Sequence, residues 1–221
     1  MKETNNFEQI QKIIDGFDKT PDKFYFVQVL NRKGNNMNLN SSNRARTIKS
    51  YFIPSTSDLE KYKKEIIFLC ESTGARAYIN LNARSFKKAA LKNILLLSNS
   101  IDNGHENTAH TTYCKAVMDS SIIDGKVWIL DFDKKDYNSS YIMGEEFSRI
   151  VTTCVPAGNY INQVPSKNGF HILVKPFRRD TFLIERERMN YKAELKIDAS
   201  TNLYIPKDDT LQDFDQISLE F

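Results

Sequence analysis

The sequence predicts an α+β protein made of two packed units, an N-terminal α/β unit over residues 1–118 and a C-terminal unit over residues 119–221. Apolar residues recur at helical spacing in several segments, and runs of strand length rich in β-branched and aromatic residues lie between them. In the C-terminal unit these elements follow in the order βαββαβ. No repeat, low-complexity block or linker divides the chain, so we expect a single domain built from both units.

The composition, net charge and cysteine count of the chain indicate which classes of protein it can belong to. Hydrophobic residues make up 40% and charged residues 27% of the chain, as in ordinary soluble globular proteins. The net charge of +3 permits a nucleic-acid partner without requiring one. Three widely spaced cysteines provide neither a disulfide framework nor a zinc site, and they favour a reduced cytoplasmic setting. The polar N-terminus and the lack of any long apolar run predict neither export nor membrane insertion.

Periodicity and turn residues define the N-terminal unit. The expected elements are a helix over 7–17, strands over 24–30 and 47–53 joined by a polar loop, a helix from Pro54 to Gly74, a strand over 75–82, a helix over 85–102 and a helix over 113–118. Polar and apolar residues alternate in 75–82, which predicts a half-exposed strand with a partly basic face able to line a cleft. The helix capped by Ser85 is expected to bury an apolar stripe, and its lysines point outward. The stripe consists of Phe86, Ala90, Ile94, Leu97 and Ile101.

The C-terminal unit is organised around the run from Lys126 to Asp133. Four consecutive apolar residues predict a buried central strand, and it ends in Asp131-Phe132-Asp133. Alternation places the two carboxylates on one face, about 6 to 7 Å apart. Like charges at a buried strand end require a compensating cation, and Mg²⁺ or Mn²⁺ prefers oxygen ligands. Two solvated acids after a strand are the other interpretation, and Asp213-Phe214-Asp215 repeats the tripeptide without a strand before it.

Further elements follow this strand. They are a loop over 136–140, a helix over 145–155, strands over 160–164 and 170–177, a helix over 182–189, strands over 194–198 and 203–205, and an acidic tail. In the strand from Phe170, the side chains of His171, Leu173 and Lys175 share one face. The turn before it, from Ser166 to Gly169, exposes backbone amides suited to an anion. The histidines His105 and His110 are expected to lie on the surface.

Three segments resemble the motifs of the archaeo-eukaryotic primase superfamily. They are the strand ending in Asp131-Phe132-Asp133, the segment Ser166-Lys167-Asn168-Gly169-Phe170-His171, and Leu195-Lys196-Ile197-Asp198. The second segment is particularly similar to the polymerase domains of bacterial end-joining ligases, although Gly169 stands where serine is common. The resemblance covers roughly residues 75 to 205. It implies a primase-like catalytic core whose C-terminal unit is like an RNA-recognition fold.

This resemblance implies a primase or primase-polymerase of a phage, plasmid or other mobile element. Asp131, Asp133 and Asp198 would bind two Mg²⁺ or Mn²⁺ ions, without zinc, and His171 would contact the phosphates of the incoming nucleoside triphosphate. Other residues expected at the nucleotide are Ser166, Lys167, Gly169 and Lys175. Basic segments would handle the single-stranded DNA template, or a separate replication protein would do so. The basic residues expected there are Arg44, Arg46, Arg76, Arg84, Lys87 and Lys88. No Walker motif is present, so a helicase would be a separate protein.

Two other functions fit parts of the sequence. A catalytically silent module like an RNA-recognition domain would use the sheet and the basic loops to hold single strands, although exposed stacking pairs of aromatic residues are not evident. A sugar-nucleotide transferase would use the D-x-D pair to hold Mn²⁺, but it would leave His171 and Asp198 without a role. Solvated surface charge is the other interpretation of the basic segments.

Overall fold

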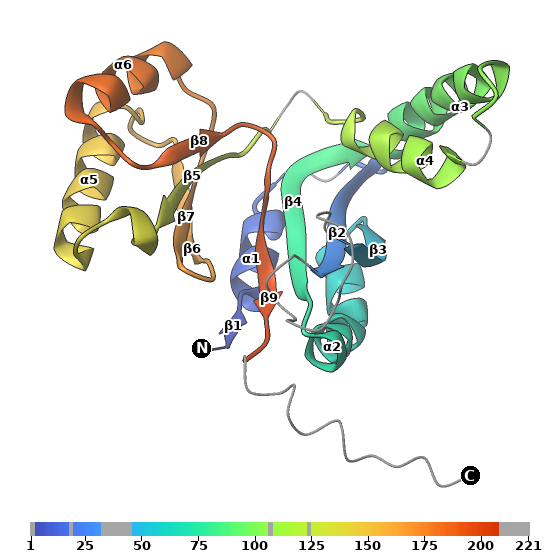
Figure 1. The fold of residues 1–221 in the computed structure, drawn as a ribbon, viewed down its shortest axis with the longest axis horizontal. Helices are drawn as coiled ribbons and strands as arrows, with labels where there is room; N and C mark the ends of the chain where they lie inside the picture. Colours follow the sequence, from blue (N-terminus) through green and yellow to red (C-terminus); the bar gives the residue numbers. More distant parts are fainter. Residues whose placement is uncertain (1–2, 18–19, 32–45, 106–107, 123–124, 208–221) are drawn as a thin grey trace, which may run out of the picture.

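The computed structural model of the chain describes residues 3–17, 20–31, 46–105, 108–122 and 125–207. Within these residues the protein is α+β, with two antiparallel sheets and six α-helices (Figure 1). The predicted fold class is therefore confirmed at this level. None of the helices described is long and apolar enough to cross a membrane.

Sheet A contains five strands and runs from the centre of Figure 1 to the right. In spatial order these are β1 (Thr4–Asn5), β9 (Ser200–Ile205), β4 (Arg76–Ser85), β2 (Lys23–Asn31) and β3 (Arg46–Ile53). Two helices, α1 (Phe7–Asp15) and α2 (Thr56–Thr73), pack with this sheet, and their apolar residues share one core with it. The strand β9 comes from the C-terminal part of the chain, so that part returns to complete the N-terminal sheet.

Sheet B contains four strands and is built entirely from the second half of the chain. In spatial order these are β6 (Tyr160–Pro165), β7 (Gly169–Val174), β5 (Trp128–Asp133) and β8 (Glu194–Lys196). Along the chain the order is β5-α5-β6-β7-α6-β8, with α5 at Ser140–Thr153 and α6 at Arg179–Met189. This is the expected βαββαβ order of elements.

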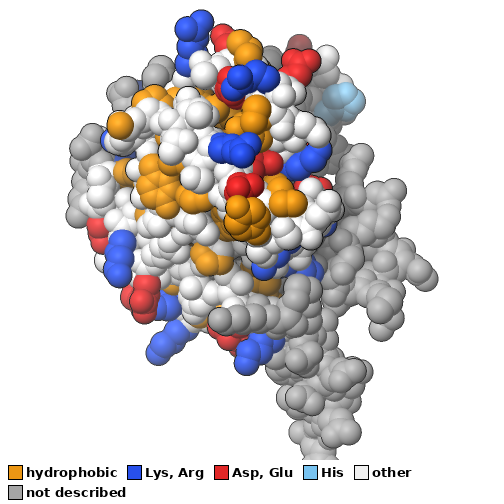
Figure 2. All heavy atoms as spheres, turned by 90° about the vertical axis from the view of Figure 1, so that its left-hand side faces the viewer, with side chains coloured by type: hydrophobic (Ala, Val, Ile, Leu, Met, Phe, Trp, Pro, Cys, Tyr) orange, Lys and Arg blue, Asp and Glu red, His pale blue; other side chains and the backbone are white. Residues whose placement is uncertain are grey.

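The two faces of sheet B have different neighbours. Phe132 and Ile172 point toward α5 and α6 and belong to a core with these helices. Ile129 and Leu173 point the other way and join the core of sheet A, α1 and α2. The outer side of the α5–α6 layer is open, and apolar side chains are scattered there among charged ones (Figure 2).

The hairpin of α3 (Phe86–Asp102) and α4 (Ala109–Met118) differs from the sequence prediction. The predicted apolar stripe of α3 is not buried: Ile94 is 66% and Ile101 53% exposed, and Ala89 is the residue that α3 buries. The reason is that the two helices extend beyond the sheet (Figure 1), where they have each other as neighbours but no second layer. His110 lies on α4 and is exposed, as is His105 before it, as predicted.

Several element boundaries also differ. Helix α5 begins at Ser140 instead of 145, because the hydroxyl of Ser139 caps it by accepting a hydrogen bond from the amide of Ile142 at 3.2 Å. Strand β8 ends at Lys196, two residues before its predicted end. Strand β4 continues to Ser85 and is almost wholly buried, so the predicted half-exposed strand is wrong. Its polar face is enclosed by the connection between β8 and β9.

Candidate active site

The register between β5 and β7 brings two of the sequence motifs together. Asp131 pairs with His171, and Asp133 pairs with Gly169, in adjacent antiparallel strands. Residues directly opposite each other project on the same face of a sheet. The D-x-D pair and the Gly-Phe-His segment, 40 residues apart in sequence, are therefore neighbours on the face of sheet B that is turned away from α5 and α6.

Asp131 lies between two cationic or hydrogen-bonding partners. Its Oδ1 is 3.3 Å from Nε2 of His171, and its Oδ2 accepts a hydrogen bond from Nζ of Lys196 at 2.5 Å. Burial raises the pKa of Asp131, but the hydrogen bonds from His171 and Lys196 outweigh burial and lower the pKa to about 2. Lys196 also lies 3.6 Å from Glu194. Asp131 is thus ionised, with one partner at each oxygen.

His171 connects the two sheets. Its Nδ1 lies 2.9 Å from the hydroxyl of Thr201, which belongs to β9 of sheet A. The ring is nearly buried and has both nitrogens engaged, Nδ1 with Thr201 and Nε2 with Asp131. The ionised Asp131 can only accept, so in the neutral ring Nε2 carries the proton and the Thr201 hydroxyl donates to Nδ1. Asp131 thus sets the tautomer of the ring, and Thr201 helps to fix its orientation.

Asp133 ends β5 and caps the short 3₁₀ helix η2 (Lys134–Asp136). Its Oδ1 accepts from the backbone amide of Lys135 at 3.3 Å, and its Oδ2 is 3.1 Å from Nζ of the same lysine. The Lys135 side chain is 72% exposed. The hydrogen bond from Lys135 to Asp133 raises the pKa of the lysine. The ammonium group that neutralises Asp133 is therefore largely exposed to water.

Position 169 requires glycine, because its backbone lies very close to β5. A Cβ added at Gly169 would lie 1.8 Å from the backbone oxygen of Phe132, a distance that no side chain tolerates. The turn before it is held against β5, because Lys134 donates its amide proton to the carbonyl of Asn168 at 2.7 Å. A residue with a side chain, such as the serine that the resemblance would lead one to expect, therefore does not fit at this position.

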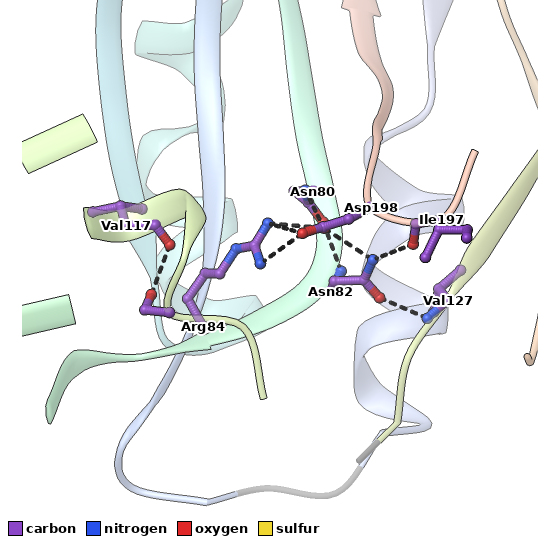
Figure 3. A network of polar contacts seen from close by, with 8 residues as sticks. Asn80, Asn82, Arg84, Val117, Val127, Ile197 and Asp198 are labelled. Atoms are coloured by element: carbon purple, nitrogen blue, oxygen red, sulfur yellow. Dashed lines mark hydrogen bonds and ion pairs between the residues drawn. The ribbon is translucent and has the colours of Figure 1, made fainter. Parts of the chain in front are cut away.

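Asp198 lies in a different environment from the other two acids (Figure 3). It follows β8 and points to β4 of sheet A, where it forms an ion pair with Arg84, with Nη2 of the arginine 2.8 Å from Oδ1. Asn80 and Asn82 donate to the same oxygen at 3.0 and 3.1 Å. Burial raises the pKa of Asp198, but the hydrogen bonds and the charge of Arg84 outweigh burial and keep the pKa below its usual value.

The predicted three-carboxylate cluster is therefore not formed in this geometry. Across the described part of the chain, no group of three or more His, Cys, Asp or Glu side chains is placed to hold a metal ion. Asp131 and Asp133 share one face of sheet B, whereas Asp198 is held by sheet A. Each of Asp131 and Asp133 has two oxygens with few donors, and the ammonium groups beside them belong to lysines whose side chains are 41% and 72% exposed. Carboxylate oxygens are the ligands that Mg²⁺ and Mn²⁺ prefer.

The other predicted residues are spread over both sheets. Ser166 and Lys167 are half-buried in the β6–β7 turn, and Lys175 is exposed just beyond the end of β7. Lys175 is about 13 Å along the strand from His171, too far to share a small site with it. The residues predicted to contact nucleic acid also differ in exposure. Arg46, Lys87 and Lys88 are exposed, Arg76 is half-buried, Arg84 is fully buried in its ion pair, and Arg44 lies outside the described residues.

Sequence reasoning missed four residues of this region. Alternation along the predicted strand 194–198 places Lys196 on one face with Glu194 and Asp198, which was a usable signal for it. Thr201, Asn80 and Asn82 contact the site from sheet A through side-chain hydrogen bonds. No local pattern indicates these contacts, because they depend on how the two sheets pack.

Comparison with known proteins finds no matching family model, no matching curated protein and no matching solved structure. The function is therefore inferred from the residues and geometry of the site.

Proposed function

We propose that the chain is a metal-dependent nucleotidyltransferase that works as a primase or primase-polymerase on a single-stranded DNA template. The observation that carries this proposal is the pairing of Asp131 with His171 in neighbouring strands. This pairing brings a carboxylate pair and a histidine, which belong to two separate sequence motifs, to one face of a sheet. The order β5-α5-β6-β7-α6-β8 supports the RNA-recognition-like unit that this family implies.

Each side chain has a role in this proposal. Asp131 and Asp133 would hold Mg²⁺ or Mn²⁺ in place of the ammonium groups of Lys196 and Lys135. When bound, the cation polarises the attacking 3′-hydroxyl and neutralises charge on the transferring phosphoryl group. His171 donates from Nε2 to a phosphate oxygen of the incoming nucleoside triphosphate, and Thr201 keeps the ring oriented. Lys167, in the β6–β7 turn, adds positive charge beside the triphosphate.

The proposed activity also implies a cellular compartment, a template-binding surface and a partner protein. Three cysteines, Cys70, Cys114 and Cys154, are free thiols, which accords with the reduced cytoplasm of a cell in which a mobile element replicates. The exposed Arg46, Lys87 and Lys88 would contact the phosphates of the template. A separate helicase or replication protein would open the duplex.

The proposal is tested by nucleotide incorporation. Purified protein is given a single-stranded template, Mg²⁺ or Mn²⁺, and ribonucleotides or deoxynucleotides. Asp131→Asn and Asp133→Asn should each lower the rate at least about 100-fold, since removal of a group that merely supports a metal ligand already costs about 10- to 100-fold. The matched control is Asp136→Asn, which removes an exposed acid three residues from Asp133. Full activity in Asp131→Asn, or no incorporation by the wild-type protein, contradicts the proposal.

A silent nucleic-acid-binding module remains the alternative, and one observation disfavours it. Such modules stack bases on an open face of their sheet. In this chain the face of sheet B opposite α5 and α6 carries Ile129 and Leu173, which are packed into the core of sheet A. Nucleic-acid binding that a chelator leaves unchanged, together with no affinity for nucleoside triphosphates, would favour the module instead.

A further inference from the structure

The oxygens of Asp198 accept from more protein groups than those of either acid of the D-x-D pair, although the Asp198 side chain is 39% exposed. A carboxylate has about four lone-pair sites. Oδ1 of Asp198 accepts from Asn80, Asn82 and Arg84, and Oδ2 accepts from both terminal nitrogens of Arg84, at 3.1 Å each. A cation ligand has to offer a lone pair, and at Asp198 a cation would compete with these five donor contacts, three of them from a charged guanidinium.

Arg84 makes three of these contacts, and among the described residues its guanidinium has no other charged partner. The Arg84 side chain has no exposed surface, and its Nε has no hydrogen-bond partner among the residues described. Withdrawing Asp198 would leave a buried guanidinium unpaired, which is one of the most costly changes inside a protein. Lys196 and Lys135, which neutralise the other two acids, have exposed side chains that return to water when displaced.

The hydrogen-bond network around Asp198 also joins the two sheets. The side chain of Asn82 accepts from the amide of Val127, just before β5, at 2.7 Å and donates to the carbonyl of Ile197 at 3.1 Å. Sheet A is thus tied both to the entry of β5 and to the connection between β8 and β9. Three residues after Asp198, on β9, Thr201 reaches His171. Asp198 thus lies in the network that joins the two sheets beside the candidate site.

We propose that Asp198 is a positioning residue that anchors Arg84 and joins the two sheets, and that the protein's share of the cation site is Asp131 and Asp133 alone. This inference rests on the proposed function and departs from the three-acid ligand set that the primase resemblance implies. Two carboxylates are sufficient, since Mg²⁺ is usually held by one or two carboxylates, with water and substrate phosphates as its remaining ligands.

The test measures Mn²⁺ binding to the full chain by the electron paramagnetic resonance signal of free Mn²⁺, with and without ATP. Asp131→Asn and Asp133→Asn should each weaken binding by about tenfold or more. The double variant Arg84→Met/Asp198→Leu removes both charges of the buried pair and should bind Mn²⁺ as the wild type does. Asp136→Asn controls for the loss of one nearby charge, and thermal melts establish that each variant is folded.

The outcomes separate this inference from the proposed function. A folded double variant that loses Mn²⁺ as Asp131→Asn does would make Asp198 a ligand, overturning the inference and leaving the nucleotidyltransferase proposal intact. A wild-type chain that takes up no Mn²⁺, even with ATP, overturns both. If the double variant does not fold, Asp198→Asn, which keeps one oxygen for Arg84, replaces it. A wild-type structure with Mn²⁺ and ATP in which an Asp198 oxygen lies within about 2.3 Å of the ion also overturns the inference.

Discussion

Asp131 lies on β5 and Asp198 directly after its neighbour β8, yet the two carboxylates have different kinds of partner. Asp131 is paired with Lys196, whose side chain is 41% exposed, and has one partner at each oxygen. Asp198 is paired with a fully buried arginine and accepts from three side chains. The difference teaches that the partner decides what a carboxylate can do. A cation that can return to water leaves its acid available for a ligand, and a buried cation does not.

The chemistry of the two partners reinforces this contrast. Arginine presents a planar fork of donors that matches a carboxylate at both oxygens, and it stays charged when buried. Lysine is a single, strongly hydrated charge on a flexible stem, and an exposed pair of this kind contributes little to stability. Arg84 is therefore suited to hold Asp198 in place. Lys196 is suited to pair with Asp131 in a way that a divalent cation can displace.

The largest loss of stability is expected for a substitution at Gly169, where β7 lies against β5. Gly169→Ala should lower the free energy of unfolding by more than about 4 kcal/mol, because its Cβ would meet the Phe132 carbonyl 1.8 Å away and push β7 from β5. Gly144→Ala, in α5, is the control: its Cβ has no neighbour within 4 Å, and the change should stabilise the protein by about 0.5–1 kcal/mol. Urea unfolding followed by circular dichroism measures both. Equal midpoints for the two variants would show that β5 and β7 do not approach this closely.

The next effect compares the two acids directly. Asp198→Ala leaves Arg84 buried and unpaired and should cost about 3–5 kcal/mol of unfolding free energy. Asp131→Ala leaves a lysine that water can solvate, but it also removes the acceptor beside the buried His171 ring, and it should cost about 2 kcal/mol, in line with a pKa lowered from 3.8 to about 2. The same unfolding experiment ranks them. Should Asp131→Ala prove the more destabilising, the contrast between a structural and an available acid would be reversed.

A double variant sharpens the same comparison. Arg84→Met/Asp198→Leu should recover part of the stability lost in Asp198→Ala, since apolar residues can replace a buried pair when both charges leave together. Recovery identifies the unpaired guanidinium as the source of the loss. No recovery would place the cost in the hydrogen bonds that Asn80 and Asn82 make to Asp198.

Local sequence pattern was sufficient for much of the fold and for half of the site. The α+β class, most strands and the shared face of Asp131 and Asp133 followed from periodicity, because each depends on residues close in sequence. The partner of Asp198 did not, since Arg84 precedes it by 114 residues and its burial depends on the packing of two sheets. The stripe of α3 was mispredicted for a related reason. An apolar face at helical spacing indicates what a helix can bury, and the neighbours that would cover it depend on tertiary structure.

The free energy of unfolding should depend on pH through the ionisation of Asp131. Its pKa is lowered in the folded protein from 3.8 to about 2, so its ionised form stabilises the fold at pH values above the unfolded pKa. That contribution should be complete above about pH 4 and disappear as the pH falls through about 2. Wild type and Asp131→Asn, unfolded by guanidinium at a series of pH values, should therefore differ above pH 4 and converge near pH 2. A difference that grows on acidification would mean that Asp131 is not ionised beside Lys196.

The smallest effect concerns the lysine itself. Lys196→Met removes the ammonium group that lies 2.5 Å from Asp131, so Mn²⁺ no longer competes with it. An exposed pair is worth about 0.2–1 kcal/mol, which corresponds to a gain in Mn²⁺ affinity of up to about fivefold. Lys92→Met is the matched control, because Lys92 is 40% exposed and lies 3.9 Å from Asp119, far from β5 in sequence. Weaker Mn²⁺ binding in Lys196→Met would mean that the lysine supports the cation site instead of competing for it, and Asp131 would then resemble Asp198 more than its exposed partner suggests.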